Sequence, residues 1–202
     1  MTSAGTTTLF LPGAGGSAGF WKKAAGRTNL DGEFLAWPGL GDEPAHPDVG
    51  GIGDLVTLVL DRMENPVNIV AQSMGGFVAL TVALIAPAKI RRLVLTATSG
   101  GVPMSDLGGS DWRAAYCQAF PLAAKWIAEP VEDLSPQISS IAAPTLLLWG
   151  DRDPISPVAV GERLRSLLPD ATLHIIEGGD HDLAQTHADA VAPLIETHLT
   201  AD

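Results

Sequence analysis

Short apolar runs typical of buried strands alternate along this 202-residue chain with stretches of helical periodicity. Most of the runs lack the strict apolar–polar alternation of a half-exposed strand, so both faces of each strand should be covered. This order predicts a parallel sheet with right-handed crossovers and helices on both faces. The predicted strands lie at 6–12, 33–39, 67–72, 90–98, 144–150 and 171–178, and the predicted helices at about 17–26, 51–64, 74–86, 156–168 and 184–199.

One interval between predicted strands is longer than a simple crossover needs. Residues 99–143 carry helical patterns near 111–128 and 132–140, together with several aromatic side chains. We interpret this stretch as a small helical, lid-like insertion over one edge of the sheet, with an ordinary long crossover as the alternative. The prediction is therefore a single α/β domain over residues 1–202, a three-layer sandwich with about six mostly parallel strands and a small helical lid.

Composition and charge argue against nucleic-acid and membrane partners. The formal net charge is −11, and no block of basic residues offers a face to nucleic acid or to an anionic membrane surface. Cys117 is the only cysteine, so a disulfide within the chain is impossible. The N-terminus lacks a basic start, and no apolar run is long enough to span a membrane. We expect a cytoplasmic monomer or homodimer with neither a nucleic-acid nor a membrane partner.

Ser73 stands at the corner where the third predicted strand turns directly into a helix. Such a corner needs small neighbours because strand and helix pack closely there, and Ala71, Gly75 and Gly76 supply them. The N–H groups of the first helical turn would favour negative charge beside the serine hydroxyl. The pattern Ala-Gln-Ser-Met-Gly therefore predicts a nucleophile elbow, with alanine in place of the first glycine of Gly-x-Ser-x-Gly.

The loop after the first predicted strand is rich in glycine, from Gly13 to Gly16. It matches neither the dinucleotide fingerprint nor the nucleoside-triphosphate loop. In an open parallel sheet, ligands bind beyond the carboxyl ends of the strands, where this loop would stand beside Ser73. We interpret it as an oxyanion loop, in which the backbone N–H groups of Ala14 and Met74 are the two donors.

Aspartates follow the fifth predicted strand, and a histidine follows the sixth. Either Asp151 or Asp153 could orient a histidine, or both could simply form a turn. His181 lies in a glycine-rich loop from which it could reach Ser73. A serine hydroxyl needs a base to take its proton and a carboxylate to hold that base in the right tautomer. The order Ser, Asp, His at separate strand ends therefore predicts a catalytic triad. The other histidines fit this role less well because of their loop, strand or terminal-helix positions: His46, His174, His187 and His198.

Over nearly all of its length, the chain resembles the α/β-hydrolase superfamily, in particular its carboxylesterase-like serine hydrolases. The motifs that carry the resemblance are Pro12-Gly13-Ala14-Gly15, Ala71-Gln72-Ser73-Met74-Gly75-Gly76, Gly150-Asp151-Arg152-Asp153 and Gly179-Asp180-His181-Asp182, with Trp37-Pro38-Gly39-Leu40-Gly41 as a further similar loop. The resemblance implies Ser73 as nucleophile, His181 as base and Asp153 as acid. It also implies a short member that has a reduced lid and lacks the family's first two strands. Pro12 departs from the usual His-Gly pair and removes a backbone donor.

The predicted function is that of a serine hydrolase that cleaves an ester or similarly activated acyl bond through an acyl-enzyme, without a metal or another cofactor. The candidate substrate-binding residues are Trp21, Trp112 and Tyr116, whose rings would suit a small molecule such as an apolar acyl or aryl ester. Core packing explains these rings as easily. Two alternatives stay open at this point. The same triad could serve a lyase or a C–C bond hydrolase, or the fold could be a non-catalytic binding protein.

Overall fold

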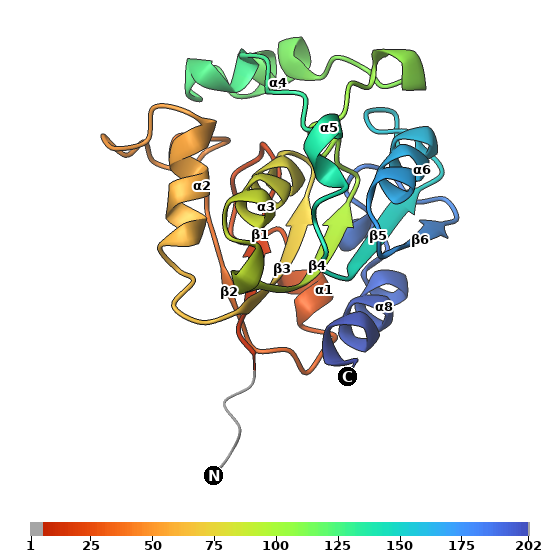
Figure 1. Ribbon diagram of the computed structural model, residues 1–202. Coiled ribbons are helices and arrows are strands. Elements are labelled where there is room, and N and C mark those ends of the chain that lie inside the picture. The colour runs from red at the N-terminus through yellow and green to blue at the C-terminus, as the bar shows by residue number, and fades with distance from the viewer. Residues whose placement is uncertain (1–5, 202) are drawn as a thin grey trace.

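A computed structural model describes residues 6–201 of the chain (Figure 1). Six parallel strands form one sheet in the order β2-β1-β3-β4-β5-β6. This confirms the predicted α/β class and the predicted number of strands. The strands are β1 (Thr8–Leu11), β2 (Gly32–Phe34), β3 (Val67–Gln72), β4 (Ile90–Thr96), β5 (Thr145–Gly150) and β6 (Ala171–Ile176).

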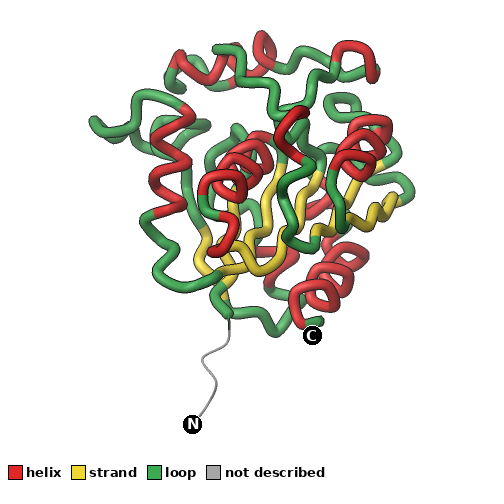
Figure 2. Tube along the Cα trace, viewed as in Figure 1, coloured by secondary structure: helices red, strands yellow, loops and turns green. Residues whose placement is uncertain are grey.

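Helices cover both faces of the sheet (Figure 2). One face carries α2 (Ile52–Leu60), α3 (Met74–Ile85), α5 (Ser135–Ile138) and α6 (Val158–Leu167). The opposite face carries α1 (Lys22–Ala25), α7 (Leu183–Thr186) and α8 (Ala188–Thr200), and a 3-10 turn, η1 (Pro87–Lys89), precedes β4. The predicted helix at 17–26 is only one turn long, and the one at 184–199 is divided at His187, which leaves helical geometry with φ −121° and ψ 34°.

Successive residues of each central strand are buried on opposite faces of the sheet. In β1, Leu9 and Leu11 pack on one side and Phe10 packs on the other, and all three are at most 1% exposed. In β5, Leu147 and Leu148 face opposite sides in the same way. This double burial explains why the strands read as continuous apolar runs instead of alternating patterns.

Residues 99–143, between β4 and β5, include α5 and three further short helices, and we keep the name insertion for this segment. These are η2 (Ser105–Leu107), α4 (Arg113–Ala119) and η3 (Lys125–Ala128). Figure 1 shows α4 above the carboxyl ends of the strands. The helical pattern near 111–128 corresponds to two short helices, α4 and η3, because Pro121 follows α4 and restricts Phe120, which leaves helical geometry with φ −123° and ψ 72°.

The two ends of the chain, residues 1–5 and residue 202, lie outside the described part. The expectation that the N-terminus carries no secretion signal concerns these residues in part. Between residues 6 and 201, none of the helices combines the length and the apolar character that crossing a membrane would require.

Candidate active site

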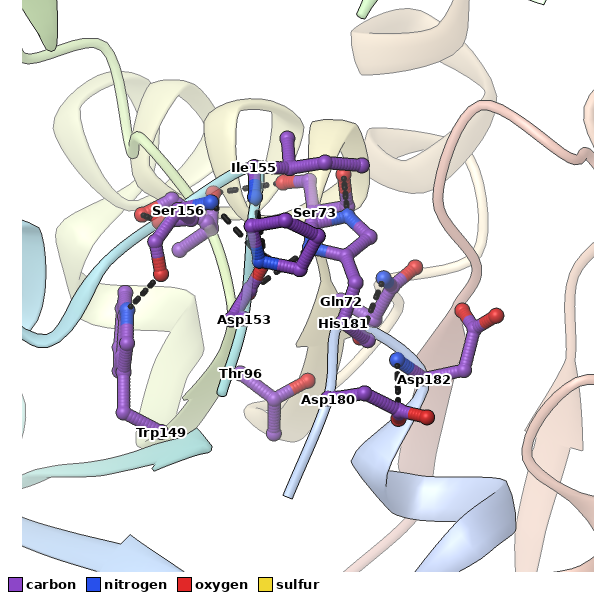
Figure 3. Close-up of polar contacts among 12 residues, drawn as sticks. Gln72, Ser73, Thr96, Trp149, Asp153, Ile155, Ser156, Asp180, His181 and Asp182 are labelled. Atoms are coloured by element: carbon purple, nitrogen blue, oxygen red, sulfur yellow. Dashed lines mark hydrogen bonds and ion pairs between the residues drawn. The ribbon is translucent and has the colours of Figure 1, made fainter. Parts of the chain in front are cut away.

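Three side chains from separate strand ends meet above the sheet (Figure 3). Ser73 follows β3, Asp153 follows β5 and His181 follows β6. The hydroxyl oxygen of Ser73 lies 3.0 Å from Nε2 of His181, and Nδ1 of His181 lies 2.8 Å from Oδ2 of Asp153. The hydroxyl, the imidazole and the carboxylate are therefore connected by two consecutive hydrogen bonds. A nucleophile, a base and an orienting acid require this arrangement.

Ser73 adopts a backbone conformation that residues other than glycine rarely take, with φ 52° and ψ −122°. Its N–H donates to the carbonyl of Thr96 over 3.0 Å, and the Thr98 hydroxyl donates to its carbonyl over 2.5 Å. A Cβ at Gly75 would lie 2.4 Å from the carbonyl oxygen of Pro12, so only glycine allows the following helix to begin so close to the first strand. The surroundings therefore hold a strained corner that projects the hydroxyl.

Asp153 is only 6% exposed, and both of its carboxylate oxygens are used. Oδ1 accepts the backbone N–H groups of Ile155 at 2.8 Å and Ser156 at 3.0 Å, which leaves Oδ2 for His181. Asp151 is exposed, and its Oδ1 accepts the N–H of Gly178 over 2.7 Å. The structure therefore places Asp153 against the histidine, whereas the carboxylate of Asp151 bonds to the loop that follows β6.

The loop that carries His181 is fixed by polar contacts on both sides. Nε2 of Gln72, the residue before the serine, donates to the carbonyl of His181 over 3.3 Å. Oδ1 of Asp180 accepts from the Asp182 N–H and from the Thr186 hydroxyl, each over 3.0 Å. Sequence reasoning missed this role of Gln72. Its position beside the serine is the only signal in the sequence, because the contact joins residues that are 109 positions apart.

The two predicted oxyanion donors lie beside Ser73. Met74 is the first residue of α3, so its N–H has no helical partner. The N–H of Ala14 donates to no acceptor within the described residues. A Cβ at Gly13 would lie 3.0 Å from Cβ of Ser73, which brings this loop directly against the serine. The arrangement leaves two backbone donors available for negative charge that develops near the hydroxyl.

Aromatic side chains hold the carbonyl groups of the oxyanion loop. The indole N–H of Trp37 donates to Pro12 over 2.7 Å, and the hydroxyl of Tyr116 donates to Ala14 over 2.8 Å. Burial raises the pKa of Tyr116 above its ordinary value, although the N–H of Gly41, which donates to the same oxygen over 2.8 Å, acts in the opposite direction. The hydroxyl is therefore protonated at neutral pH and remains a donor.

The family model described as "Alpha/beta hydrolase family" matches residues 8–194. The chain belongs to the alpha/beta hydrolase family. A poly(3-hydroxyalkanoate) depolymerase from Ectopseudomonas oleovorans is 30% identical over 207 residues, which cover 80% of this chain and 72% of that protein. A 2-hydroxy-6-oxo-6-phenylhexa-2,4-dienoate hydrolase from Burkholderia cepacia is 25% identical over 248 residues, which cover 92% and 85%. These relatives of the chain are hydrolases.

Solved structures show the same fold. A thermophilic esterase from Thermogutta terrifontis superimposes with a TM-score of 0.77 at 18% identity, over 96% of this chain and 89% of that one. At this level of identity the similarity concerns the fold alone. The all-parallel sheet of this alpha/beta hydrolase and its flanking helices agree with it.

A cavity of about 700 Å³ opens beside the serine of this alpha/beta hydrolase. Its lining includes Trp112 and Tyr116, two of the three predicted substrate-binding residues. Trp21, the third, is 1% exposed and does not line the cavity, because its indole N–H donates to the carbonyl of Leu11 over 2.9 Å in the core. Its neighbour Phe20 lines the cavity instead. The sequence alone could not show which of these two adjacent aromatic residues faces the cavity.

The cavity presents acidic and not basic side chains. Asp111 and Asp182 line it, and no lysine or arginine belongs to its lining among residues 6–201. Burial raises the pKa of Asp182 above its ordinary value; His181 opposes this shift, and the charges of Asp180 and Asp153 add to it. In the same residues, no three His, Cys, Asp or Glu side chains are grouped so as to hold a metal ion.

Proposed function

We propose that this protein is a serine hydrolase that cleaves a carboxylic ester or a similarly activated acyl bond. The observation that carries the proposal is the unbroken contact from Ser73 through His181 to the buried carboxylate of Asp153, at the wall of a large cavity. A hydroxyl, an imidazole and a carboxylate in this order can generate a nucleophile at neutral pH. The chain's membership of a hydrolase family supports the same reaction class.

In the proposed mechanism, Oγ of Ser73 attacks the carbonyl carbon while Nε2 of His181 takes the hydroxyl proton. Asp153 stabilises the imidazolium, and the N–H groups of Ala14 and Met74 bind the oxyanion. Collapse of the tetrahedral intermediate breaks the bond to the leaving group, which receives the proton from His181. Water then attacks the acyl-enzyme with His181 as base, and release of the carboxylic acid restores the serine.

The character of the cavity supports an uncharged, apolar ester over an anionic substrate. Its lining is largely apolar, including Phe20, Ala115 and Phe120, and its charged groups are carboxylates. A substrate that carries a carboxylate or a phosphate would meet like charge without a compensating cation. Two alternatives remain. The same triad could serve a lyase or a C–C bond hydrolase, or the protein could have a non-catalytic role, and the following experiment separates these alternatives.

The test uses a short p-nitrophenyl ester and a fluorophosphonate probe with the wild-type chain and two variants. We expect ester hydrolysis and labelling of Ser73, and we expect both to disappear in Ser73→Ala. Ser110→Ala is the matched control, since Ser110 lines the same cavity but its hydroxyl donates to Pro154 and not to the histidine. Full esterase activity in Ser73→Ala would remove the assigned nucleophile. Labelling without turnover of any ester would favour another reaction of the triad, and no labelling would favour a binding protein.

We also propose a cytoplasmic location and a monomeric or homodimeric state. They are supported by the acidic charge and the single cysteine of the sequence. Cell fractionation and light scattering would test them.

A further inference from the structure

Ser73 and His181 stand between two cavities of very different size. The larger, of about 700 Å³, lies on the side of the oxyanion loop and α4. The smaller, of about 70 Å³, lies on the side of the first turn of α3. Ser73, His181, Trp112 and Ile155 line both, so these four residues mark where the two spaces meet. A carbonyl group attacked by Ser73 would therefore direct its two substituents into unequal spaces.

The lining of the smaller cavity is more apolar than polar, although the hydroxyl-bearing residues Ser99 and Ser156 also belong to it. Phe77 and Ala97, which are 6% and 1% exposed, belong to the core, while Met104 and Val131 come from the insertion. Because a water molecule occupies about 30 Å³, this cavity has space for about two or three methylene groups. The one cation in its lining, Arg113, lies 3.5 Å from the Asp111 carboxylate. A short alkyl group suits this space better than a charged one.

A longer substituent on this side would meet an obstruction. A third cavity, also of about 70 Å³, lies further along the insertion. Met74, Trp112, Arg113 and Val131 line both small cavities and therefore stand between them. Only a displacement of these side chains would join the two spaces.

We infer that the substrate is a strongly asymmetric ester, with a short substituent of up to about three carbons on one side of the carbonyl group and a long or bulky, uncharged apolar group on the other. This inference rests on the proposed serine hydrolase and specifies its substrate class. The short group is either the acyl part or the alcohol part of the ester, and the experiment below distinguishes the two.

Three isomeric esters of the same composition test the inference. Methyl decanoate has a short alcohol, nonyl acetate has a short acyl group, and pentyl hexanoate has two chains of middle length. We expect kcat/KM for the better of the first two to exceed that for pentyl hexanoate at least tenfold. Preference for methyl decanoate places the alcohol in the smaller cavity, and preference for nonyl acetate places the acyl group there. Equal or faster hydrolysis of pentyl hexanoate would overturn the inference.

Paired variants assign the preference to the cavities. Met104→Ala enlarges the smaller cavity and should raise the relative rate for pentyl hexanoate at least fivefold. Leu107→Ala, in the same part of the insertion but in neither cavity lining, should leave that ratio unchanged. Ala115→Trp should obstruct the larger cavity and slow the preferred ester at least tenfold, while Ala114→Trp, one residue away and outside both linings, should not. If each variant behaved like its control, the cavities would not determine the selectivity.

Binding without turnover separates this inference from the proposed reaction. Two isomeric ketones, 2-undecanone and 6-undecanone, carry the same two patterns of substituents but cannot be hydrolysed. Titrated into the Ser73→Ala protein and followed by calorimetry, 2-undecanone should bind at least fivefold more tightly. This result would support the asymmetric site even if no ester were hydrolysed. Equal affinities, or tighter binding of 6-undecanone, would refute the asymmetric site even if esters were hydrolysed.

Discussion

The hydroxyl of Tyr116 donates to the carbonyl of Ala14 over 2.8 Å and ties the insertion to the oxyanion loop. The same oxygen accepts the N–H of Gly41 over 2.8 Å, so one side chain of α4 joins two loops of the sheet domain. The indole N–H of Trp37 donates to the carbonyl of Pro12, two residues before Ala14 in the same loop. Pro12 occupies the position where the sequence departs from the usual His-Gly pair. Trp37 and Tyr116, which lie far from this loop in the sequence, therefore supply hydrogen bonds to the oxyanion loop, in which Pro12 has no backbone N–H to donate.

The first prediction concerns Tyr116→Phe, which removes one hydroxyl and leaves the ring in place. Two buried backbone groups lose their partner, at a cost of about 1–3 kcal/mol. If the hydroxyl positions the oxyanion loop, kcat should fall about tenfold while KM changes little, because the loop acts chiefly on the transition state. Steady-state kinetics with a short p-nitrophenyl ester, well below the melting temperature, measures this.

A control distinguishes positioning from simple stability. Affinity for an alkylboronic acid, which forms a tetrahedral anion on the serine, should fall together with kcat in Tyr116→Phe. A lower melting temperature with unchanged kcat and unchanged boronate affinity would mean that the hydroxyl supports the fold alone.

The second prediction uses the two aspartates that follow β5. Asp153→Asn removes the charge that would stabilise the His181 cation, and kcat should fall about 10³–10⁴-fold. Asp151→Asn is the matched control, since Asp151 is exposed and its carboxylate accepts the N–H of Gly178; its kcat should stay within about twofold. Equal losses in the two variants would contradict the assignment of Asp153 to the histidine.

The features that sequence patterns predicted here are local ones. A strand that turns into a helix at Ser73 is recognisable because Gly75 and Gly76 must be small, and the order of strands and helices fixes which loops share one edge of the sheet. Spacing alone left Asp151 and Asp153 equivalent. What separates them is the pair of backbone N–H groups that donates only to the second carboxylate, a contact that appears once the turn is folded.

The features that could not be predicted depend on long-range packing. Phe20 and Trp21 are adjacent aromatic residues, and only the fold decides that the first lines the cavity while the second donates to Leu11 in the core. The contact between Tyr116 and Ala14 joins residues 102 positions apart and leaves no local signature. Helical periodicity in the insertion extended beyond the real helices because it does not register the interruption at Pro121.

The third prediction compares two glycines that are each the second residue of a helix, Gly75 of α3 and Gly53 of α2. A Cβ at Gly75 would lie 2.4 Å from the carbonyl oxygen of Pro12 and 3.0 Å from that of Leu11, both of them backbone atoms that cannot turn away. Gly75→Ala should therefore lower the free energy of unfolding by about 1–3 kcal/mol and displace the oxyanion loop, with a loss of activity.

Gly53→Ala provides the control for that substitution. Apart from its chain neighbours and the backbone of its own helix, nothing in residues 6–201 lies within 4 Å of a Cβ at Gly53, so alanine should stabilise the protein by about 0.5 kcal/mol through its helix propensity, with unchanged activity. Urea denaturation measures both variants. A Gly75→Ala protein as stable and as active as Gly53→Ala would show that the close approach of α3 to the first strand is not required.

The fourth prediction concerns the pH dependence of stability at Asp182. Partial burial raises the pKa of this carboxyl in the folded protein. As pH rises from the ordinary carboxyl pKa through the raised pKa, the unfolded state loses its proton more readily, so the folded state becomes less stable relative to it. A side-chain amide at this position would stay neutral throughout. The melting temperature of Asp182→Asn, minus that of the wild type, should therefore increase as pH rises from the ordinary carboxyl pKa through the raised one, as differential scanning fluorimetry would measure.

Asp189→Asn gives the opposite sign and serves as the comparison. A hydrogen bond from Arg27 lowers the pKa of Asp189, so this carboxylate stabilises the folded state above its ordinary pKa, and the contribution is lost as pH falls through the lowered value. Its replacement should reduce the melting temperature near neutral pH and have a smaller effect in acid. A difference in melting temperature for Asp182→Asn that does not change with pH would mean that the partial desolvation of this largely exposed side chain does not disfavour its charge.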